Sequence, residues 1–236
     1  MKYTFEWDVF LKSIGGNETY LTWLMTAWRW TLLVSVLSFA LAFFAGFLFG
    51  VLRTTNNKYL ERIGNAWAEL FRNIPLLVQL FLWYHVIPSL FPIMNKIPSF
   101  LLVVIALGLF TSARIADQVK AGVFTLPTGQ RYAALALGLT VVQSYRYVLL
   151  PQTLRIIIPP LTSEAMNIVK NSSVAFAIGI AELTMFAMQA QEETSRGIEI
   201  YLVVTGLYFI SAFIVNLVAQ FIEYKISIPS STGARK

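Results

Sequence analysis

The sequence predicts an all-α protein that crosses a membrane five times, and its composition and uncharged runs are the basis of that prediction. Hydrophobic residues make up 57% of the 236 residues and charged residues only 13%, which is about half the charged share of a soluble domain. Three runs, 30–52, 73–95 and 200–222, contain no charged residue. As helices they each cover roughly 34 Å, which exceeds a hydrocarbon core of roughly 30 Å.

Five helices follow in chain order from these runs and from two further apolar stretches. The stretch 101–110 heads a helix that continues past Arg114, and the stretch 156–181 supplies another. Prolines in the run 73–95 mark either the kinks of a gate or helix ends: Pro75, Pro88 and Pro92. The predicted helices cover 24–52, 66–92, 98–122, 158–186 and 199–224.

The basic residues predict how these helices are oriented, because cytoplasmic flanks are enriched in Lys and Arg. An odd number of spans places the termini on opposite sides. One side holds Arg53, Lys58, Arg62, Arg72, Lys120, Arg131, Arg146, Arg155, Lys225, Arg235 and Lys236. The other side holds only Lys2, Lys12, Arg29, Lys96 and Arg196. The C-terminus is therefore expected in the cytoplasm and the N-terminus outside, with Trp23, Trp28 and Trp30 in an outer interfacial belt.

Three regions follow from this topology. Residues 1–23 form an extracytoplasmic segment, 24–226 the membrane domain and 227–236 a cytoplasmic tail. The first twenty residues lack the basic start and compact apolar core of a cleaved signal, so we expect them to be retained.

The residue types present exclude several kinds of site. The chain has no cysteine and a single histidine, His85, which excludes disulfides, thiolate chemistry and a zinc site built by this chain alone. His85 is either a proton relay or a hydrogen-bonded wall residue of the second span. No Gly-Lys dipeptide occurs, so the phosphate-binding G-x-x-x-x-G-K-[ST] loop is absent and any ATP binds to another chain. The basic residues are scattered between apolar runs, which argues against nucleic-acid binding.

The segment 129–151, between the third and fourth predicted spans, is more than a connector. Its residues 133–137 favour a helix, and Gly138 breaks that helix. Residues 142–150 resume it until Pro151 ends it. The segment is thus predicted to be a short helix, a turn and a second helix on the cytoplasmic face.

This segment resembles the "EAA" loop of bacterial ABC importer permeases, through Ala133-Ala134, Gly138 and Val148-x-Leu150-Pro151. Tyr132 stands where that family usually has glutamate. The resemblance implies that the segment forms coupling helices, at about 131–150, which dock in a cleft of a cytoplasmic ATPase. The residues expected to carry this coupling are Ala133, Ala134, Gly138, Arg146, Leu150 and Pro151.

Two further regions resemble the polar amino-acid subfamily of these permeases. The first is 69–79, and the second comprises the stretches 159–164 and 167–172. The subfamily is HisMQ-like and belongs to the binding-protein-dependent type I importers with a MetI-like fold; within it the likeness is greatest to glutamate/aspartate importer permeases. It implies a bacterial inner-membrane location, an ATPase dimer that holds ATP and Mg, a second and different permease chain, and an extracytoplasmic binding protein. This chain itself would hold no cofactor.

Arg114 is the first of three charged residues expected inside the membrane, where such charges usually belong to a pathway or to an ion pair. Asp117 follows three residues later on the same helix face, so a local Arg114–Asp117 pair is one interpretation. The other is that the planar guanidinium binds a substrate carboxylate, which would favour an acidic solute.

Glu164 and Lys170 are the other two charges. Glu164 shares a helix face with Asn167 and either accepts the ammonium of an amino acid or lies at a helix start beside the N-terminal dipole. Lys170 either snorkels to the cytoplasm or pairs with Glu164 or Asp117. The predicted substrate-binding residues are Arg114, Glu164, Asn167 and Lys170.

These features together predict a permease that moves polar amino acids, glutamate or aspartate above all, by alternating access and without bond chemistry of its own. Glutamine, histidine and arginine remain alternative substrates. An ion-coupled secondary carrier or a membrane scaffold would also fit the hydropathy, but neither explains the segment 129–151.

Overall fold

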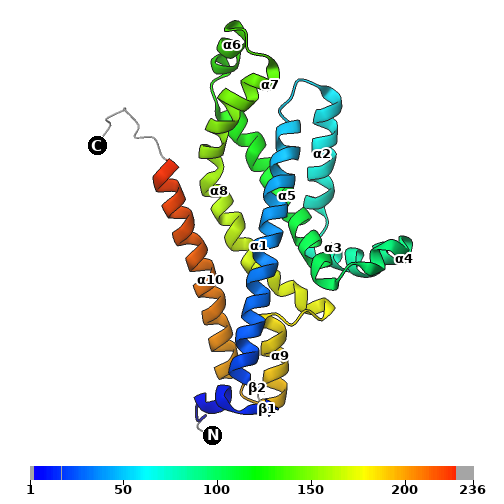
Figure 1. The fold of residues 1–236 in the computed structure, drawn as a ribbon, viewed down its shortest axis with the longest axis vertical. Coiled ribbons are helices and arrows are strands. Elements are labelled where there is room, and N and C mark those ends of the chain that lie inside the picture. The colour runs from blue at the N-terminus through cyan, green and yellow to red at the C-terminus, as the bar shows by residue number, and fades with distance from the viewer. Residues whose placement is uncertain (1–2, 17, 227–236) are drawn as a thin grey trace.

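The computed structural model describes residues 3–16 and 18–226 as an elongated helical bundle. Four long helices run along it: α1 (Tyr20–Leu52), α5 (Ser99–Thr125), α8 (Leu150–Asn171) and α10 (Gly197–Ile226). Figure 1 shows α6 (Thr128–Ala136) and α7 (Val141–Ser144) at one end of the bundle, and β1 (Ser13–Gly15) and β2 (Glu18–Thr19) at the other. The all-α prediction is confirmed apart from this small hairpin.

Close contact between α1 and α5 forms the centre of the bundle. Gly46 and Gly50 lie on α1 where the two helices meet. A Cβ added at Gly46 would lie 2.6 Å from the Cβ of Ile115, and one at Gly50 would lie 2.6 Å from the Cβ of Val119. Small residues of this kind let membrane helices approach closely. The buried core spreads from this seam to α8.

The predicted span 66–92 is not one helix. Helix α2 (Lys58–Asn73) ends at Asn73, and α3 (Leu76–Phe81) starts after Pro75 in a direction that differs by 102°. Proline lacks an N–H and disfavours helical backbone at the preceding residue, and Ile74 is accordingly extended, with ψ of 128°. The π-helical turn η2 (Leu82–Val86), α4 (Ile87–Leu90) and the 3-10 turn η3 (Pro92–Lys96) continue the chain. In Figure 1 this part projects sideways from the bundle.

Gln79 satisfies the backbone at this bend. Its side chain is 2% exposed, and its Nε2 donates hydrogen bonds to the carbonyl oxygens of Phe71 at 2.7 Å and Ile74 at 2.9 Å. These carbonyls lie near the end of α2. If the helix continued, backbone N–H groups of its next turn would bind them.

The predicted span 158–186 is also wrong as a single helix. Helix α8 starts at Leu150 and ends at Asn171, and the 3-10 turn η5 (Ser172–Ile178) follows. Gly179 then adopts the left-handed conformation with φ of 79°, and the chain continues as α9 (Leu183–Thr194) at an angle of 54°. Pro159 and Pro160 lie inside α8 and do not start it. Prolines are tolerated inside membrane helices, where neighbouring groups bind the freed carbonyls.

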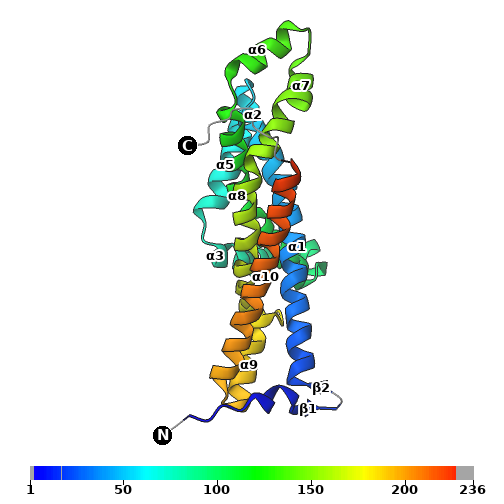
Figure 2. The same cartoon turned by 90° about the vertical axis from the view of Figure 1, so that its left-hand side faces the viewer.

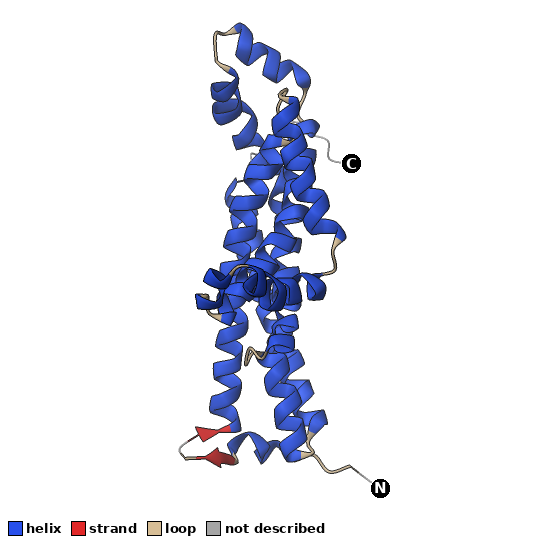
Figure 3. Ribbon diagram, turned by 90° about the vertical axis from the view of Figure 1, so that its right-hand side faces the viewer, coloured by secondary structure: helices blue, strands red, loops and turns tan. Residues whose placement is uncertain are grey.

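The N-terminal segment covers the end of the bundle opposite to α6 and α7. It contains the 3-10 turn η1 (Trp7–Leu11) and the antiparallel pair β1–β2, which are red in Figure 3. Tyr3 donates a hydrogen bond to Glu199 at the start of α10, and Arg196 forms an ion pair with Glu6. The hydrogen bond to the Glu199 carboxylate raises the pKa of the Tyr3 hydroxyl.

Three described helices are long and apolar enough to cross a membrane by themselves: α1, α5 and α10. The total is up to five if each bent pair is one span. Helix α1 starts at Tyr20, so the predicted boundary at residue 23 lies inside it. The predicted tail, 227–236, lies outside the described residues.

Candidate substrate site and coupling segment

Arg114 and Glu164 meet between two of the long helices. Arg114 lies on α5 and Glu164 on α8, and the Arg114 Nη1 is 3.8 Å from the Glu164 Oε2. The Arg114 side chain is 42% exposed whereas that of Glu164 is 10% exposed. Glu164 lies well inside α8, so its interpretation as a helix-start carboxylate is wrong.

The Glu164 carboxylate is only partly satisfied by its neighbours. Gln118, one turn after Arg114 on α5, donates from Nε2 to the Glu164 Oε1 at 3.2 Å. The Oε2 atom has no hydrogen-bond donor among the described residues, and the amide of Asn167 lies beside the carboxylate on α8. The arrangement leaves a buried, unpaired acceptor on Glu164 beside a half-exposed guanidinium on Arg114.

Asp117 does not pair with Arg114, which corrects the local-pair interpretation. Its Oδ1 is 2.6 Å from the Arg53 Nη1, and its Oδ2 is 2.9 Å from the Arg72 Nη1. These arginines come from the ends of α1 and α2. Asp117 therefore pairs with arginines of other helices, and not with Arg114 three residues before it on α5. Arg114 faces Glu164 of α8 instead.

The structure brings together three of the four predicted substrate residues and leaves one outside. Arg114, Glu164 and Asn167 share one neighbourhood, whereas Lys170 lies exposed in the last turn of α8. Lys170 forms no ion pair with Glu164 or Asp117 in the described part of the chain, so that interpretation was wrong. Gln118 was absent from the predicted set, although its i+4 spacing from Arg114 was a usable signal.

The segment 129–151 has the predicted helix, turn and helix. Helix α6 ends at Ala136, Gly138 is left-handed with φ of 84°, and α7 is followed by the π-helical turn η4 (Tyr145–Leu149). Figure 2 shows α6 and α7 at the tip of the molecule. Pro151 does not end the second helix as expected; it lies in the first turn of α8, where a missing N–H is tolerated. The segment 129–151 thus runs directly into α8, the helix that carries Glu164.

Large apolar side chains are exposed on this tip. Leu137 is 84% exposed, Val142 is 75% exposed and Tyr132 is 70% exposed. Ala134, by contrast, is 4% exposed and packs inward. This end of the bundle thus presents apolar side chains outside the long helices of the bundle.

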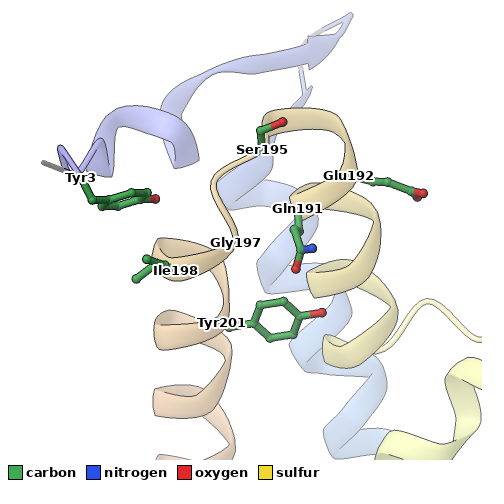
Figure 4. Close-up of a pocket in the computed structure, with 7 residues that line it drawn as sticks. All are labelled: Tyr3, Gln191, Glu192, Ser195, Gly197, Ile198 and Tyr201. Atoms are coloured by element: carbon green, nitrogen blue, oxygen red, sulfur yellow. The ribbon is translucent and has the colours of Figure 1, made fainter. Parts of the chain in front are cut away.

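A separate open depression of about 710 Å³ lies at the other end of the bundle. Figure 4 shows the side chains that line it where the N-terminal segment meets α9 and α10. They are Tyr3, Gln191, Glu192, Ser195, Gly197, Ile198 and Tyr201. None of the predicted substrate residues is among them.

Comparison with known proteins shows which family the chain resembles. The family model described as "Binding-protein-dependent transport system inner membrane component" matches residues 38–228. The chain is 41% identical, over 246 aligned positions that cover 100% of both chains, to the glutamate/aspartate import permease protein GltJ of Escherichia coli (strain K12). It is 30% identical to the glutamine transport system permease protein GlnP of the same organism, over 85% of this chain and 91% of that protein.

Solved structures agree. The crystal structure of an amino acid ABC transporter with histidines contains a chain with a TM-score of 0.76 and 29% identity, covering 87% of this chain and 95% of that one. A chain of the inward-facing MetNI methionine ABC transporter has a TM-score of 0.77 at 24% identity, covering 88% of this chain and 98% of that one; this second likeness concerns the fold alone.

Proposed function

Because the chain belongs to the family of binding-protein-dependent transport system inner membrane components, we propose that its solutes are the acidic amino acids glutamate and aspartate. The chain is a multi-pass permease subunit of an amino-acid ABC importer in the bacterial inner membrane. It is a transport subunit, and ATP hydrolysis belongs to a separate chain.

The observation that carries the substrate proposal is the Arg114–Glu164 pair, supported by the whole-length similarity to a glutamate/aspartate permease. A guanidinium binds a carboxylate through two parallel hydrogen bonds. Arg114 would hold the side-chain carboxylate of the solute, Glu164 its ammonium group, and Asn167 would lie beside them. Lys170, in the last turn of α8, forms no ion pair with Glu164 in the described part of the chain and is left out of the proposed site.

The exposed tip formed by α6 and α7 supports a docking role for the segment 129–151. The partners we propose are an ATPase dimer, which would hold ATP and Mg, a second permease of different sequence and an extracytoplasmic amino-acid-binding protein. Ala133 and Ala134 lie in α6, Gly138 in the turn after it and Arg146 in η4, and Leu150 and Pro151 are the first two residues of α8. Movement of a docked ATPase would thereby reach the helix that carries Glu164.

The orientation that fits this role places the tip in the cytoplasm and the N-terminal segment outside. Transport then proceeds by alternating access, with solute bound differently in two states of the bundle. The energy comes from the ATPase, and the permease supplies the site and the path.

Competition uptake tests the proposal. The complex is purified with its ATPase and second permease, placed in vesicles and supplied with its binding protein and labelled glutamate. We expect uptake that requires ATP, competition by aspartate and no competition by arginine or histidine. Preference for a cationic amino acid would overturn the proposed substrate, and uptake driven by an ion gradient without ATP would identify a secondary carrier instead.

A further inference from the structure

The turn between α1 and α2, residues 53–57, is in contact with both the coupling segment and the helix that carries Arg114. On one side of this turn, Asp117 of α5 binds two guanidinium groups, Arg53 at 2.6 Å and Arg72 at 2.9 Å. The Arg53 Nε also donates to the Asn65 Oδ1 of α2 at 2.9 Å. A single carboxylate of α5 thus holds the ends of α1 and α2 together.

Burial makes loss of the Arg53 contact the more costly of the two. The Arg53 side chain is 9% exposed, whereas that of Arg72 is 47% exposed. A buried guanidinium depends on its partner because water does not replace the lost carboxylate. The position is also crowded: a Cβ added to Gly64 of α2 would lie 2.5 Å from the Arg53 Cγ. The turn therefore has little freedom to move independently of α5.

The coupling segment contacts the same turn from the other side. The hydroxyl of Tyr145, which is 7% exposed, donates to the carbonyl oxygen of Thr54 at 2.6 Å. Arg131 of α6 donates from Nη1 to the Asn56 Oδ1 at 3.2 Å, and its guanidinium lies 5.8 Å from the centre of the Tyr145 ring. Both helices of the coupling segment are therefore tied to the turn.

We propose that this turn is a mechanical link through which movement of the coupling segment reaches Arg114, with Tyr145–Thr54 and Arg53–Asp117 as its two joints. Asp117 lies one helical turn from Arg114 on α5, so a shift of the turn moves the helix that presents Arg114. The segment thereby acts on both sides of the site, on Glu164 through α8 and on Arg114 through the turn. Tyr145, Arg53 and Asp117 are positioning residues, and the inference rests on the proposed coupling function.

The test uses the assembled complex in vesicles and compares ATP hydrolysis with and without loaded binding protein. We expect Tyr145→Phe, which removes one hydroxyl and keeps the ring, to lower the ratio of stimulated to basal hydrolysis at least about threefold. The matched control is Tyr59→Phe. Tyr59 follows the same turn, is 76% exposed, and its hydroxyl makes no hydrogen bond within residues 3–16 and 18–226. The ratio of stimulated to basal hydrolysis in the Tyr59→Phe complex is expected to equal that of the unmodified complex.

A double variant tests whether the two joints act in series. Asp117→Asn should lower the ratio as well, and Tyr145→Phe combined with Asp117→Asn should do no more than the more damaging single change. Arg53→Lys, which keeps the charge, should retain more of the ratio than Arg53→Gln. The inference is overturned if Tyr145→Phe matches Tyr59→Phe, or if the two single effects multiply. No stimulation of the unmodified complex would instead overturn the proposed function itself.

Discussion

Arg114 and Glu164 face each other across two helices at 3.8 Å, nearly an ångström longer than a charge-assisted hydrogen bond of about 2.8 Å. The pair is close enough for each charge to stabilise the other, yet within residues 3–16 and 18–226 the Glu164 Oε2 accepts no hydrogen bond and the Arg114 guanidinium donates none. Arg114 is 42% exposed, so a solute carboxylate can reach it. The predictions for the site follow from this incomplete contact.

Replacement of Arg114 by Gln should weaken glutamate binding. Hydrogen bonds to charged groups contribute about 1.5–3 kcal/mol, so the Kd should rise at least about tenfold. The measurement is equilibrium binding of labelled glutamate to the purified complex without the binding protein. Lys120→Gln removes a positive charge six residues further along the same helix and serves as the control, with an unchanged Kd. An equal Kd for Arg114→Gln would remove this residue from the site.

Glu164→Gln should also weaken glutamate binding, and the combination with Arg114→Gln distinguishes a site from a structural pair. If each residue holds a different end of the solute, the two increases in Kd should multiply. If the residues only bind each other, the double variant should resemble the worse single variant. We expect multiplication, measured in the same binding assay.

Asp117 should stabilise the fold mainly through its buried partner. Asp117→Ala leaves the Arg53 guanidinium, 9% exposed, without its carboxylate, and should reduce the free energy of unfolding by about 3 kcal/mol. Arg72→Gln removes only the exposed arm of the same cluster, and its effect should stay below about 1 kcal/mol. Thermal unfolding of the detergent-purified chain compares the two. Equal losses of unfolding free energy in the two variants would mean that the buried Arg53 contact contributes no more to stability than the exposed Arg72 contact.

Gly46→Ala should loosen the contact between α1 and α5. The new methyl group would lie 2.7 Å from the carbonyl oxygen of Ser112 as well as close to Ile115, and overpacking of this kind costs about 1–3 kcal/mol. Gly206 on α10 has nothing within 4 Å of the corresponding position. Gly206→Ala should therefore be neutral or stabilising. Thermal unfolding in detergent measures both; a destabilised Gly206→Ala with an unaffected Gly46→Ala would contradict the close-packing explanation.

Hydropathy predicted α1, α5 and α10 well because each contains a long, strongly apolar stretch with no proline inside the helix. It failed at the predicted spans 66–92 and 158–186, whose prolines act in opposite ways. Pro75 ends a helix, whereas Pro159 and Pro160 do not interrupt one. The outcome depends on whether neighbours can satisfy the freed carbonyls, and a single sequence does not show those neighbours.

In the candidate site, too, spacings within one helix could be read from the sequence and contacts between helices could not. The i+4 spacing of Gln118 from Arg114 was visible in the sequence, and the pairing of Arg114 with Glu164 was not, because it joins separate helices. Asp117 appeared to be the local partner of Arg114 by spacing alone. Only the fold brings Arg53 and Arg72 to Asp117 and so releases Arg114 for another partner.

Gln79 carries a wider lesson about polar residues in apolar surroundings. Water normally solvates the last carbonyls of a helix, and the hydrocarbon interior has none to offer. The Gln79 amide donates to the carbonyl oxygens of Phe71 and Ile74, and so takes the place that water has at such a bend in a soluble protein. A buried polar side chain in an apolar bundle can therefore satisfy the backbone without meeting a solute. Gln79 is closed off at 2% exposure, whereas the Arg114 side chain is 42% exposed.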